Sequence, residues 1–321
     1  EGAGRTVAGN LRHGQLVILE STTYPGTTEE ILQPIIESTG RSVGRDVFLG
    51  YSPERVDPGN STFNLRNTPK IVSGVTDECR DRVVNFYSDL VDEVVISAGV
   101  KEAEMTKLLE NTYRHINIAL VNEMAQFCSQ LQIDLWEVIR CASTKPFGFS
   151  AFYPGPGVGG HCIPIDPSYL SHQVRLRLGA PFRFVELAQE VNAGMPSYVV
   201  RRLQEMLNGE SKPVKNSRVL LLGVTYKANI SDIRESPAVD VAKILDGLGA
   251  KVFFSDPYVD LWDVHGVQVT KFEDWQDGLR DFDVAVLLQA HDAFDLSEVQ
   301  KSGIPILDTR GLLSGEKVTR L

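Results

Sequence analysis

The chain has 321 residues, a length typical of two domains, and 42% of them are hydrophobic and 23% charged, as in an ordinary globular protein. Its 32 Lys and Arg residues against 42 Asp and Glu residues leave a net charge of −10, which argues against a nucleic-acid partner. No apolar run approaches the roughly 20 residues that span a bilayer. Four widely spaced cysteines without a CxxC pair indicate neither a zinc site nor a disulfide framework. We expect a cytoplasmic protein without metal, membrane or nucleic-acid partner.

The first hundred residues have the pattern of an α/β layer. A polar, helix-like stretch precedes the first apolar strand at 16–21. Further strands are predicted at 47–53, 70–75 and 93–99, alternating with helices at 29–39 and 77–91. This alternation is typical of βαβ units in a sheet that is covered on both faces.

The middle of the chain is predicted to be helical. Residues 101–131 contain no Gly or Pro, and their apolar residues recur at helical spacing, so one long helix is expected. Such a helix can join two domains and offer a surface to a second subunit. A helix at 133–143, a loop rich in Gly and Pro at 145–167 and a helix at 182–207 follow.

A second α/β unit follows a polar linker. Its strands are predicted at 218–224, 251–257, 283–290 and 304–311, with a helix at 237–248. Its first turn lacks GxGxxG, so a dinucleotide need not bind there. We therefore predict an α/β protein with the C-terminal part of a Rossmann-like domain (1–99), a long central helix within a helical region (100–208) and a second Rossmann-like, doubly wound domain (209–321).

Two groups of residues in the helical region could carry chemistry. Cys162 in GVGGHCIPIDP lies among glycines that allow backbone to approach a ligand, so it is either a nucleophile or a small buried apolar residue. Asp166 could cap the helix that follows or orient water. Lys107 and Asn111 share a helix face at i, i+4 and form a donor pair suited to an oxyanion, unless that face is simply solvated.

The ends of the predicted strands carry further polar residues. Thr22 in STTYPG and Glu54 in YSPER lie where open α/β sheets bind ligands, although a turn, or pairing of Glu54 with Arg55 or Lys70, would also explain them. In the second unit Lys227, Arg234 and Arg310 could form the local cationic site that an acidic chain needs to bind a diphosphate.

Five motifs, in this order, resemble the UDP-glucose/GDP-mannose dehydrogenase family: STTYPGTTEE, YSPERVDPGN, EMTKLLENTYR, PFGFSAFYPGPGVGGHCIPIDP and GVTYKANISDIRESPA. The resemblance runs from about residue 5 to 313. It implies an NAD-dependent, four-electron oxidation of the C6 alcohol of a UDP-sugar to the carboxylate. The expected substrate is UDP-N-acetylglucosamine, and the product would supply polysaccharide synthesis. The resemblance also implies a homodimer formed through the 101–131 helix.

The resemblance assigns roles to the candidate residues. Cys162 would form a thiohemiacetal and then a thioester, Lys107 and Asn111 would stabilise the oxyanion, Asp166 with Thr22 would hold water and transfer protons, and Glu54 would be the acid/base for thioester hydrolysis. Thr22, Glu54 and Arg234 would contact NAD. The UDP-sugar would be bound by Phe152, Tyr153, Gly155, Gly157, Lys227 and Arg310.

One departure from the family pattern leaves alternatives open. No GxGxxG follows an N-terminal first strand, so we expect most of the NAD-binding domain to be missing and Glu1 to mark a cut in a longer protein or the start of its ordered part. A UDP-sugar-binding module without a complete NAD site is therefore one alternative. A Cys/His hydrolase that uses Cys162 with His161, or His115, is another.

Overall fold

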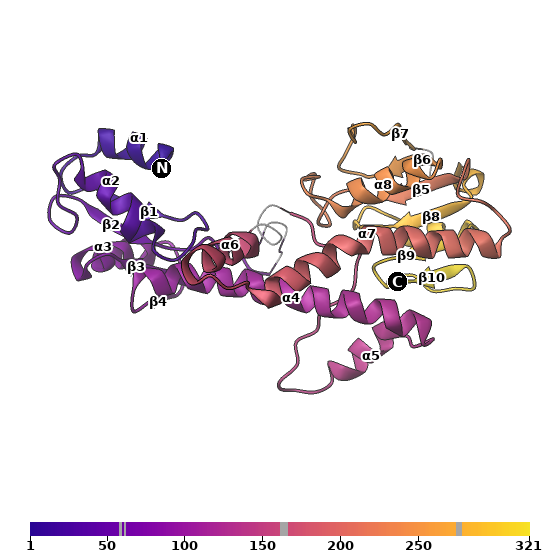
Figure 1. The fold of residues 1–321 in the computed structure, drawn as a ribbon, viewed down its shortest axis with the longest axis horizontal. Coiled ribbons are helices and arrows are strands. Elements are labelled where there is room, and N and C mark those ends of the chain that lie inside the picture. The colour runs from indigo at the N-terminus through magenta and orange to yellow at the C-terminus, as the bar shows by residue number, and fades with distance from the viewer. Residues whose placement is uncertain (58–59, 61, 161–165, 274–277) are drawn as a thin grey trace. The chain divides into compact units, whose positions relative to one another are not determined.

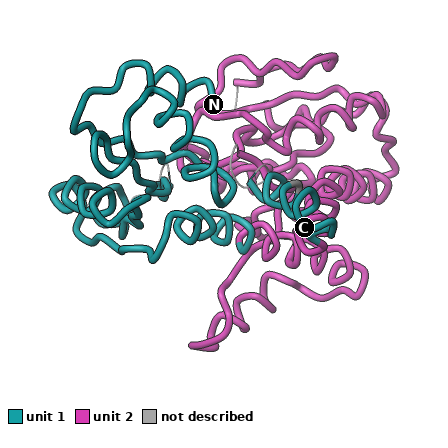
Figure 2. The backbone as a smooth tube through the Cα atoms, turned by 60° about the vertical axis from the view of Figure 1, so that its left-hand side comes forward, with its two compact units in different colours: residues 1–113, 166–182 teal, residues 114–165, 183–321 magenta. Residues whose placement is uncertain are grey.

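The structure is a computed structural model that describes residues 1–57, 60, 62–160, 166–273 and 278–321 (Figure 1). Its chain divides into two compact units, residues 1–113 with 166–182 (unit 1) and residues 114–165 with 183–321 (unit 2), as Figure 2 shows. The long helix expected at 101–131 is observed as α4 (Val100–Gln130), which contributes residues to both units. The three consecutive domains expected from the sequence stay a prediction.

Unit 1 is an α/β layer around a four-stranded sheet of order β1-β2-β3-β4. β1 pairs with β2 in parallel, and β3 pairs with β4 in parallel, but β3 runs antiparallel to β2. A parallel return to the same sheet needs a long crossover, usually a helix, and the described part of 52–69 contains none. Besides the first part of α4, the elements of unit 1 are α1 (Gly2–Asn10), β1 (Leu16–Leu19), the π-helix η1 (Thr28–Leu32), α2 (Gln33–Glu37), β2 (Phe48–Tyr51), β3 (Lys70–Gly74), α3 (Asp77–Ser88), β4 (Val94–Ile96) and α6 (Asp166–Leu178).

The antiparallel return decides which residues meet at the edge of this sheet. The carboxyl ends of β1 and β2 lie at the same edge as the amino end of β3, because β3 enters the sheet there. Lys70, the first residue of β3, is thereby brought to the residues that follow β1 and β2.

Unit 2 contains a six-stranded, all-parallel sheet of order β10-β9-β8-β5-β6-β7. The chain runs outward from β5 to β7 and then returns to the other side of β5, so this sheet is doubly wound, as expected. With the rest of α4, the elements of unit 2 are α5 (Leu135–Ala142), α7 (Arg183–Gly209), β5 (Arg218–Leu222), α8 (Pro237–Gly247), β6 (Lys251–Ser255), β7 (Val269–Lys271), the 3-10 helix η2 (Gly278–Asp281), β8 (Val284–Leu287), α9 (Leu296–Lys301), β9 (Ile306–Asp308) and β10 (Val318–Arg320).

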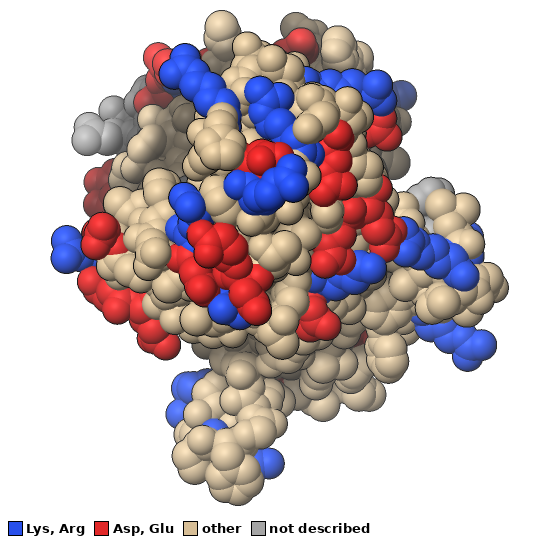
Figure 3. Space-filling model, turned by 90° about the vertical axis from the view of Figure 1, so that its left-hand side faces the viewer, with Lys and Arg blue, Asp and Glu red and all other residues tan. Residues whose placement is uncertain are grey.

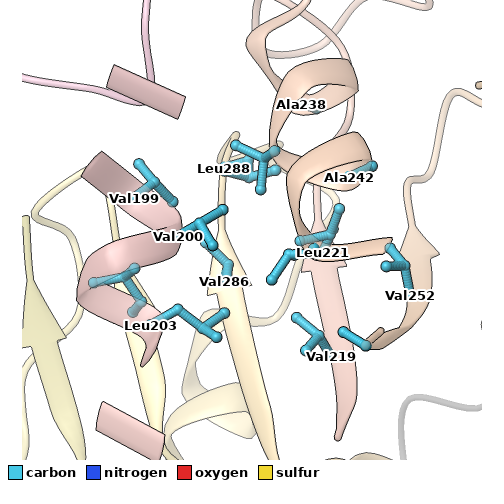
Figure 4. Close-up of a cluster of buried hydrophobic side chains, with 14 of the residues drawn as sticks. Val199, Val200, Leu203, Val219, Leu221, Ala238, Ala242, Val252, Val286 and Leu288 are labelled. Carbon is cyan, nitrogen blue, oxygen red and sulfur yellow. The ribbon is translucent and has the colours of Figure 1, made fainter. Parts of the chain in front are cut away.

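The central strand of unit 2 is apolar on both faces because helices cover both faces. Val219 and Leu221 of β5 belong to a buried cluster with residues of α7 and α8, and Figure 4 shows them together with Val200 of α7 and Ala242 of α8. Leu220 and its neighbour Leu222 belong to a separate cluster on the opposite face of the sheet. Such continuous apolar runs are typical of buried parallel strands, and the α/β fold class expected from the sequence is confirmed.

Charged side chains of both signs lie on the face of the molecule that Figure 3 draws. On the face drawn in Figure 3, Asp and Glu side chains gather in patches bordered by Lys and Arg, so neither sign forms a continuous surface there. Among the described helices, none combines the length and the apolar character needed to cross a bilayer.

Candidate active site

The sheet edge of unit 1 holds a buried cation between two carboxylates. The Nζ atom of Lys70 lies 3.0 Å from Glu20 Oε1 and 3.4 Å from Glu54 Oε2, and the Lys70 side chain is only 3% exposed. The Tyr87 hydroxyl donates to Glu20 over 2.5 Å. Glu54 also accepts a hydrogen bond from the backbone N–H of Val56. The pairing of Glu54 with Lys70, one of the alternatives from the sequence, is therefore observed.

A fully buried carboxylate fastens α4 to the turn after β1. Glu104 accepts hydrogen bonds from the backbone N–H of Gly26 (2.5 Å), the backbone N–H of Thr28 (2.9 Å) and the Thr28 hydroxyl (2.7 Å). Glu104 is not among the residues predicted from the sequence, because an acid in a helix has the same local pattern whether it faces solvent or a buried partner. This contact keeps the first turns of α4 at the edge where β1 ends.

The amide of Asn111 and the carboxylate of Asp166 meet inside unit 1. Asn111 Nδ2 donates to Asp166 Oδ2 over 2.6 Å, and both side chains are buried. Asp166 is the first residue of α6, so the hydrogen bond joins α4 to the segment that directly follows 161–165. Lys107, one helical turn before Asn111, is half-buried and makes no ion pair or hydrogen bond within the described residues. The structure therefore brings together two of the predicted site residues and leaves the Lys107 ammonium available.

A tyrosine that the sequence analysis did not single out lies among the same acids. Tyr51, the last residue of β2, is fully buried, and its hydroxyl has no hydrogen-bond partner in the described part of the chain. Burial raises the pKa of Tyr51 well above its usual range, and the carboxylates of Glu104, Asp166 and Glu110 raise it further. The phenol therefore stays protonated and can donate a hydrogen bond at this edge.

The threonines after β1 lie at the position where an open α/β sheet binds ligands. Thr22 is half-buried, and the hydroxyl of its neighbour Thr23 is buried without a partner among the described residues. A buried hydroxyl without a partner is costly, so this edge suits a ligand that forms hydrogen bonds, such as the ribose or amide groups of NAD. The residues present at the edge thus fit the cofactor.

In unit 2 the loop before Cys162 lies against the loop after β9. Tyr153 stacks on Trp136 of α5, with ring centroids 5.7 Å apart and planes 14° from parallel, and Phe152 packs against a cluster that includes Leu135. The Cα of Gly155 faces Arg310 so closely that an added Cβ would lie 3.4 Å from its guanidinium. Phe152, Tyr153, Gly155 and Arg310, all predicted to bind substrate, therefore belong to one region.

The cations of unit 2 differ in their surroundings. Arg310 donates to the carbonyl of Leu288, and desolvation lowers the pKa of Arg310 to about 10, so it remains charged at neutral pH. Lys227 lies in the loop after β5, where its carbonyl accepts from the Thr225 hydroxyl. Arg234 is exposed and forms an ion pair with Asp232. Arg234 thus reaches solvent, whereas Arg310 is held beside the loop.

The remaining predicted and alternative residues are Cys162, His161, His115 and Gly157. Cys162, the expected nucleophile, and His161 lie outside the described residues. His115, the other histidine of the hydrolase alternative, is buried and contacts Asn192.

Gly157, with a φ of +136°, lines a cavity of about 280 Å³ together with His115 and Asn192. A cavity of about 490 Å³ near the end of α4 contains none of the predicted site residues.

Comparisons with known proteins identify the family of this chain. Three domains of the UDP-glucose/GDP-mannose dehydrogenase family match the chain: the NAD binding domain at residues 1–91, the central domain at 101–194 and the UDP binding domain at 220–315. A UDP-N-acetyl-D-glucosamine 6-dehydrogenase from Pseudomonas aeruginosa is 34% identical over 98% of this chain and 76% of its own length. The chain belongs to the UDP-glucose/GDP-mannose dehydrogenase family.

Further relatives extend the match. A UDP-N-acetyl-D-glucosamine 6-dehydrogenase from Salmonella typhi is 39% identical over 82% of this chain and 61% of its own length. The solved structure of a UDP-D-ManNAc dehydrogenase from Pyrococcus horikoshii has a TM-score of 0.86 and 31% identity, and the match covers 99% of this chain and 75% of that chain. The relatives are named for different sugars, so the family is shown while the sugar is not.

These findings confirm three expectations and correct another. The chain is a nucleotide-sugar dehydrogenase, an oxidoreductase with NAD as cofactor, and its second Rossmann-like domain is a UDP binding domain. The expectation that most of the NAD-binding domain is missing is wrong, because that domain matches residues 1–91. The alternative of a sugar-binding module without a complete NAD site loses its basis for the same reason. The prediction relied on the absence of a GxGxxG motif, whereas residues 1–91 match the NAD binding domain without that motif.

Proposed function

We propose that this dehydrogenase catalyses the NAD-dependent four-electron oxidation of the C6 alcohol of a UDP-sugar to the carboxylate, with UDP-N-acetylglucosamine as substrate. The observation that carries the proposal is the buried hydrogen bond from Asn111 to Asp166. It holds an amide donor of α4 against a carboxylate four residues after Cys162, with the Lys107 ammonium one turn away. A nucleophile, a donor pair and a proton acceptor are the groups that this oxidation needs.

Cys162 is the proposed nucleophile. After the alcohol has lost one hydride and one proton, the thiolate bonds to C6 of the aldehyde and the carbonyl oxygen becomes an oxyanion. Lys107 and Asn111 stabilise that oxyanion, since a cation and an amide donor lower the cost of negative charge in a site shielded from water. Loss of a second hydride from C6 converts the thiohemiacetal to a thioester, which keeps the reactive aldehyde bound to the protein.

Hydrolysis of the thioester needs a water molecule and a proton acceptor. We assign the positioning of water to Asp166 with Thr22, and the acceptance of its proton to Glu54. Water adds to the thioester carbonyl, the C–S bond breaks, and the Cys162 thiolate and the carboxylate product are released. Two contacts within unit 1 support these roles, because each orients a carboxylate. They are the hydrogen bond of Asp166 with Asn111 and the ion pair of Glu54 with Lys70.

The cofactor would be held at the ends of β1 and β2. Thr22 and Glu54 are the proposed contacts in unit 1, and Arg234, which is exposed in unit 2, is a proposed contact for its phosphates. When bound, NAD supplies the hydride acceptor. Tyr51 adds a protonated hydroxyl at the edge, since its raised pKa keeps it a donor throughout the physiological range.

The UDP-sugar would be bound by the loop before Cys162 and by cations of unit 2. Arg310 and Lys227 are the proposed partners of the diphosphate, and Arg310 is suited to this role because its guanidinium stays charged and lies against Gly155. Phe152 and Tyr153 would contact the nucleoside, and Gly157 lets the backbone follow the ligand closely, because its φ is open mainly to glycine.

A homodimer through α4 is also proposed. Exposed apolar side chains recur along one stripe of this helix at spacings of four and seven, which is the pattern of a helix surface that packs against another helix. They are Met105, Leu109, Tyr113, Leu120 and Phe127 of α4 and Leu131, which directly follows it, each at least 40% exposed.

The direct test of the chemistry is covalent trapping on Cys162. The protein is incubated with NAD and the 6-aldehyde of UDP-N-acetylglucosamine, and intact and peptide mass spectrometry measures the adduct. We expect an adduct on the peptide containing Cys162, its loss in Cys162→Ala, and its retention in Cys141→Ala, which removes an exposed free thiol elsewhere in the chain. A thioester that still forms in Cys162→Ala would contradict the mechanism.

The sugar is tested with a substrate panel. NADH formation is followed with UDP-N-acetylglucosamine, UDP-N-acetylmannosamine, UDP-N-acetylgalactosamine and UDP-glucose at matched concentrations. We expect the highest kcat/KM with UDP-N-acetylglucosamine. Since one small group typically changes the activation free energy by about 1–3 kcal/mol, preferences of about 5-fold to 150-fold are expected. A higher kcat/KM with another sugar would reject the assigned substrate and leave the chemistry intact.

A further inference from the structure

The loop before Cys162 is anchored to unit 2 by a buried pair of asparagines. The backbone N–H of Gly155 donates to Asn122 Oδ1 over 2.9 Å. Asn122 Nδ2 in turn donates to Asn192 Oδ1, also over 2.9 Å. Asn122 belongs to α4 and is fully buried, and Asn192 belongs to α7 and is 5% exposed. One backbone amide of the loop is therefore linked to two helices through buried side chains.

The two hydrogen bonds that link Gly155, Asn122 and Asn192 form a relay, which ends at the buried imidazole of His115. Asn192 Nδ2 lies 3.4 Å from the carbonyl oxygen of His115 and 3.5 Å from its Nδ1 atom. Burial lowers the pKa of His115, so its ring is neutral at physiological pH and the relay carries no charge. The cavity of about 280 Å³ is lined by His115 and Asn192 and also by Gly157 of the loop, so this end of the relay and the loop border the same cavity.

The chemistry of the relay permits one orientation of each amide. The Gly155 N–H can only donate, so the Asn122 oxygen must face the loop and its NH₂ must face α7. Asn192 must then present its oxygen to Asn122 and its NH₂ to His115. Reversing either amide would place two donors or two acceptors together in a buried site, which costs more than an ordinary hydrogen bond gains. The loop is thus held in one register.

The anchored amide lies between groups assigned to the UDP-sugar. Gly155 lies against the Arg310 guanidinium, and Tyr153, two residues earlier, stacks on Trp136. We propose that Asn122 is a positioning residue, which fixes the loop 152–157 through Gly155 in the conformation that binds the UDP-sugar. This proposal rests on the proposed function for its ligand, but the anchoring itself can be measured without turnover.

A role limited to packing α4 against α7 makes a different prediction, and the chain offers a matched control. Gln126, one helical turn after Asn122, also joins α4 to α7, since its Nε2 lies 3.7 Å from Met195 Sδ, but it makes no hydrogen bond to the described part of the loop. Gln126→Leu therefore perturbs the contact between the two helices and leaves the loop anchor in place.

The first experiment measures hydrogen exchange of the loop. Peptides covering 150–158 are followed by mass spectrometry in the wild type, Asn122→Leu and Gln126→Leu, without ligand. We expect about tenfold faster exchange at Gly155 in Asn122→Leu, because its N–H loses a buried acceptor, and wild-type exchange in Gln126→Leu. Asn192→Leu, which removes only the second link, should accelerate exchange about threefold and provides a test if Asn122→Leu does not fold. Equal exchange at Gly155 in the Asn122, Asn192 and Gln126 variants overturns the proposal.

The second experiment separates the two ligands. In Asn122→Leu we expect the KM for UDP-N-acetylglucosamine to rise about tenfold, because the loop must be ordered when the substrate binds, and the KM for NAD to stay at the wild-type value. A parallel rise of both KM values overturns the assignment to the sugar loop. Failure of the wild type to oxidise any UDP-sugar would reject the proposed function instead, and the exchange experiment would still decide whether Asn122 anchors the loop.

Discussion

At the scale of single residues, two lysines of unit 1 each pair with two glutamates, but the two sets of ion pairs are expected to differ in their contribution to stability. Lys70 and Lys101 each face two glutamates, Glu20 and Glu54 in one case and Glu29 and Glu30 in the other. The Lys70 side chain is 3% exposed and that of Lys101 is 49% exposed. Because water screens exposed pairs, only the Lys70 contacts are expected to contribute measurably to stability.

Replacement of each lysine by methionine tests this difference. We expect Lys70→Met to lower the free energy of unfolding by about 2 kcal/mol, because two carboxylates lose their buried cation, and Lys101→Met to change it immeasurably. Urea denaturation at pH 7 gives both values. Equal effects of the two substitutions would show that burial of Lys70 does not matter.

The same pair predicts a dependence on pH. Partial burial opposes ionisation of Glu20, but hydrogen bonds from Tyr87 and Lys70 outweigh it and hold the pKa of Glu20 below its usual value. A carboxyl whose pKa is lower in the folded state than in the unfolded chain stabilises the fold when the pH is above the unfolded-state pKa. This contribution is lost as the pH falls through the folded-state pKa. The difference between wild type and Lys70→Met should therefore shrink below about pH 4.

At the scale of elements, a buried aspartate joins three strand ends of the UDP binding domain. Asp256 follows β6 and accepts hydrogen bonds from the backbone N–H of Val224 (2.7 Å) and of Tyr258 (2.8 Å), and its Oδ2 lies 3.0 Å from His291 Nε2. The N–H of Asn229 donates to His291 Nδ1, so the neutral ring carries its proton on Nε2 and donates it to Asp256.

This arrangement explains why the second Rossmann-like domain need not bind a dinucleotide. In dinucleotide-binding domains an acid at the end of the second strand holds a ribose. Asp256 occupies that place after β6, but its two oxygens are already taken by Val224, Tyr258 and His291. The missing glycine fingerprint and the occupied acid therefore lead to the same conclusion.

Asp256→Asn tests the contribution of this residue. We expect a loss of about 2 kcal/mol in the free energy of unfolding at pH 7, because an amide NH₂ would face a donor in this buried site. Burial alone would raise the pKa of Asp256, but the hydrogen bonds from His291 and the two backbone groups lower it, so the loss should diminish only in strong acid. Thermal or urea denaturation measures it, with the exposed Asp260→Asn as control. Equal stability of the two variants would contradict the assignment.

At the scale of the whole molecule, the exposed stripe of α4 bears on assembly. Sedimentation equilibrium of Leu120→Glu tests the proposed homodimer, since a buried charge at a helix interface is unfavourable. We expect the dissociation constant to rise at least about tenfold. Leu261→Glu, on an 89% exposed residue of the UDP binding domain, should leave it unchanged. Dimers of undiminished affinity in Leu120→Glu would place the interface elsewhere.

The sequence by itself determined most of the longer strands and helices, the length of α4, the doubly wound second domain and the family, because apolar periodicity, Gly and Pro positions and short motifs are local in the chain. The short elements β7, α9 and β10 were not predicted. The sequence could not determine the reversal of β3, the clamp by Glu104, the pairing of Asn111 with Asp166 or the relay from Gly155 through Asn122 to Asn192. Partners in these contacts are separated by tens of residues, and an acid or an amide in a helix has the same local pattern whether it faces solvent or a buried partner. Only the tertiary structure decides which buried donor meets which acceptor, because each buried polar group must find a partner wherever the fold supplies one.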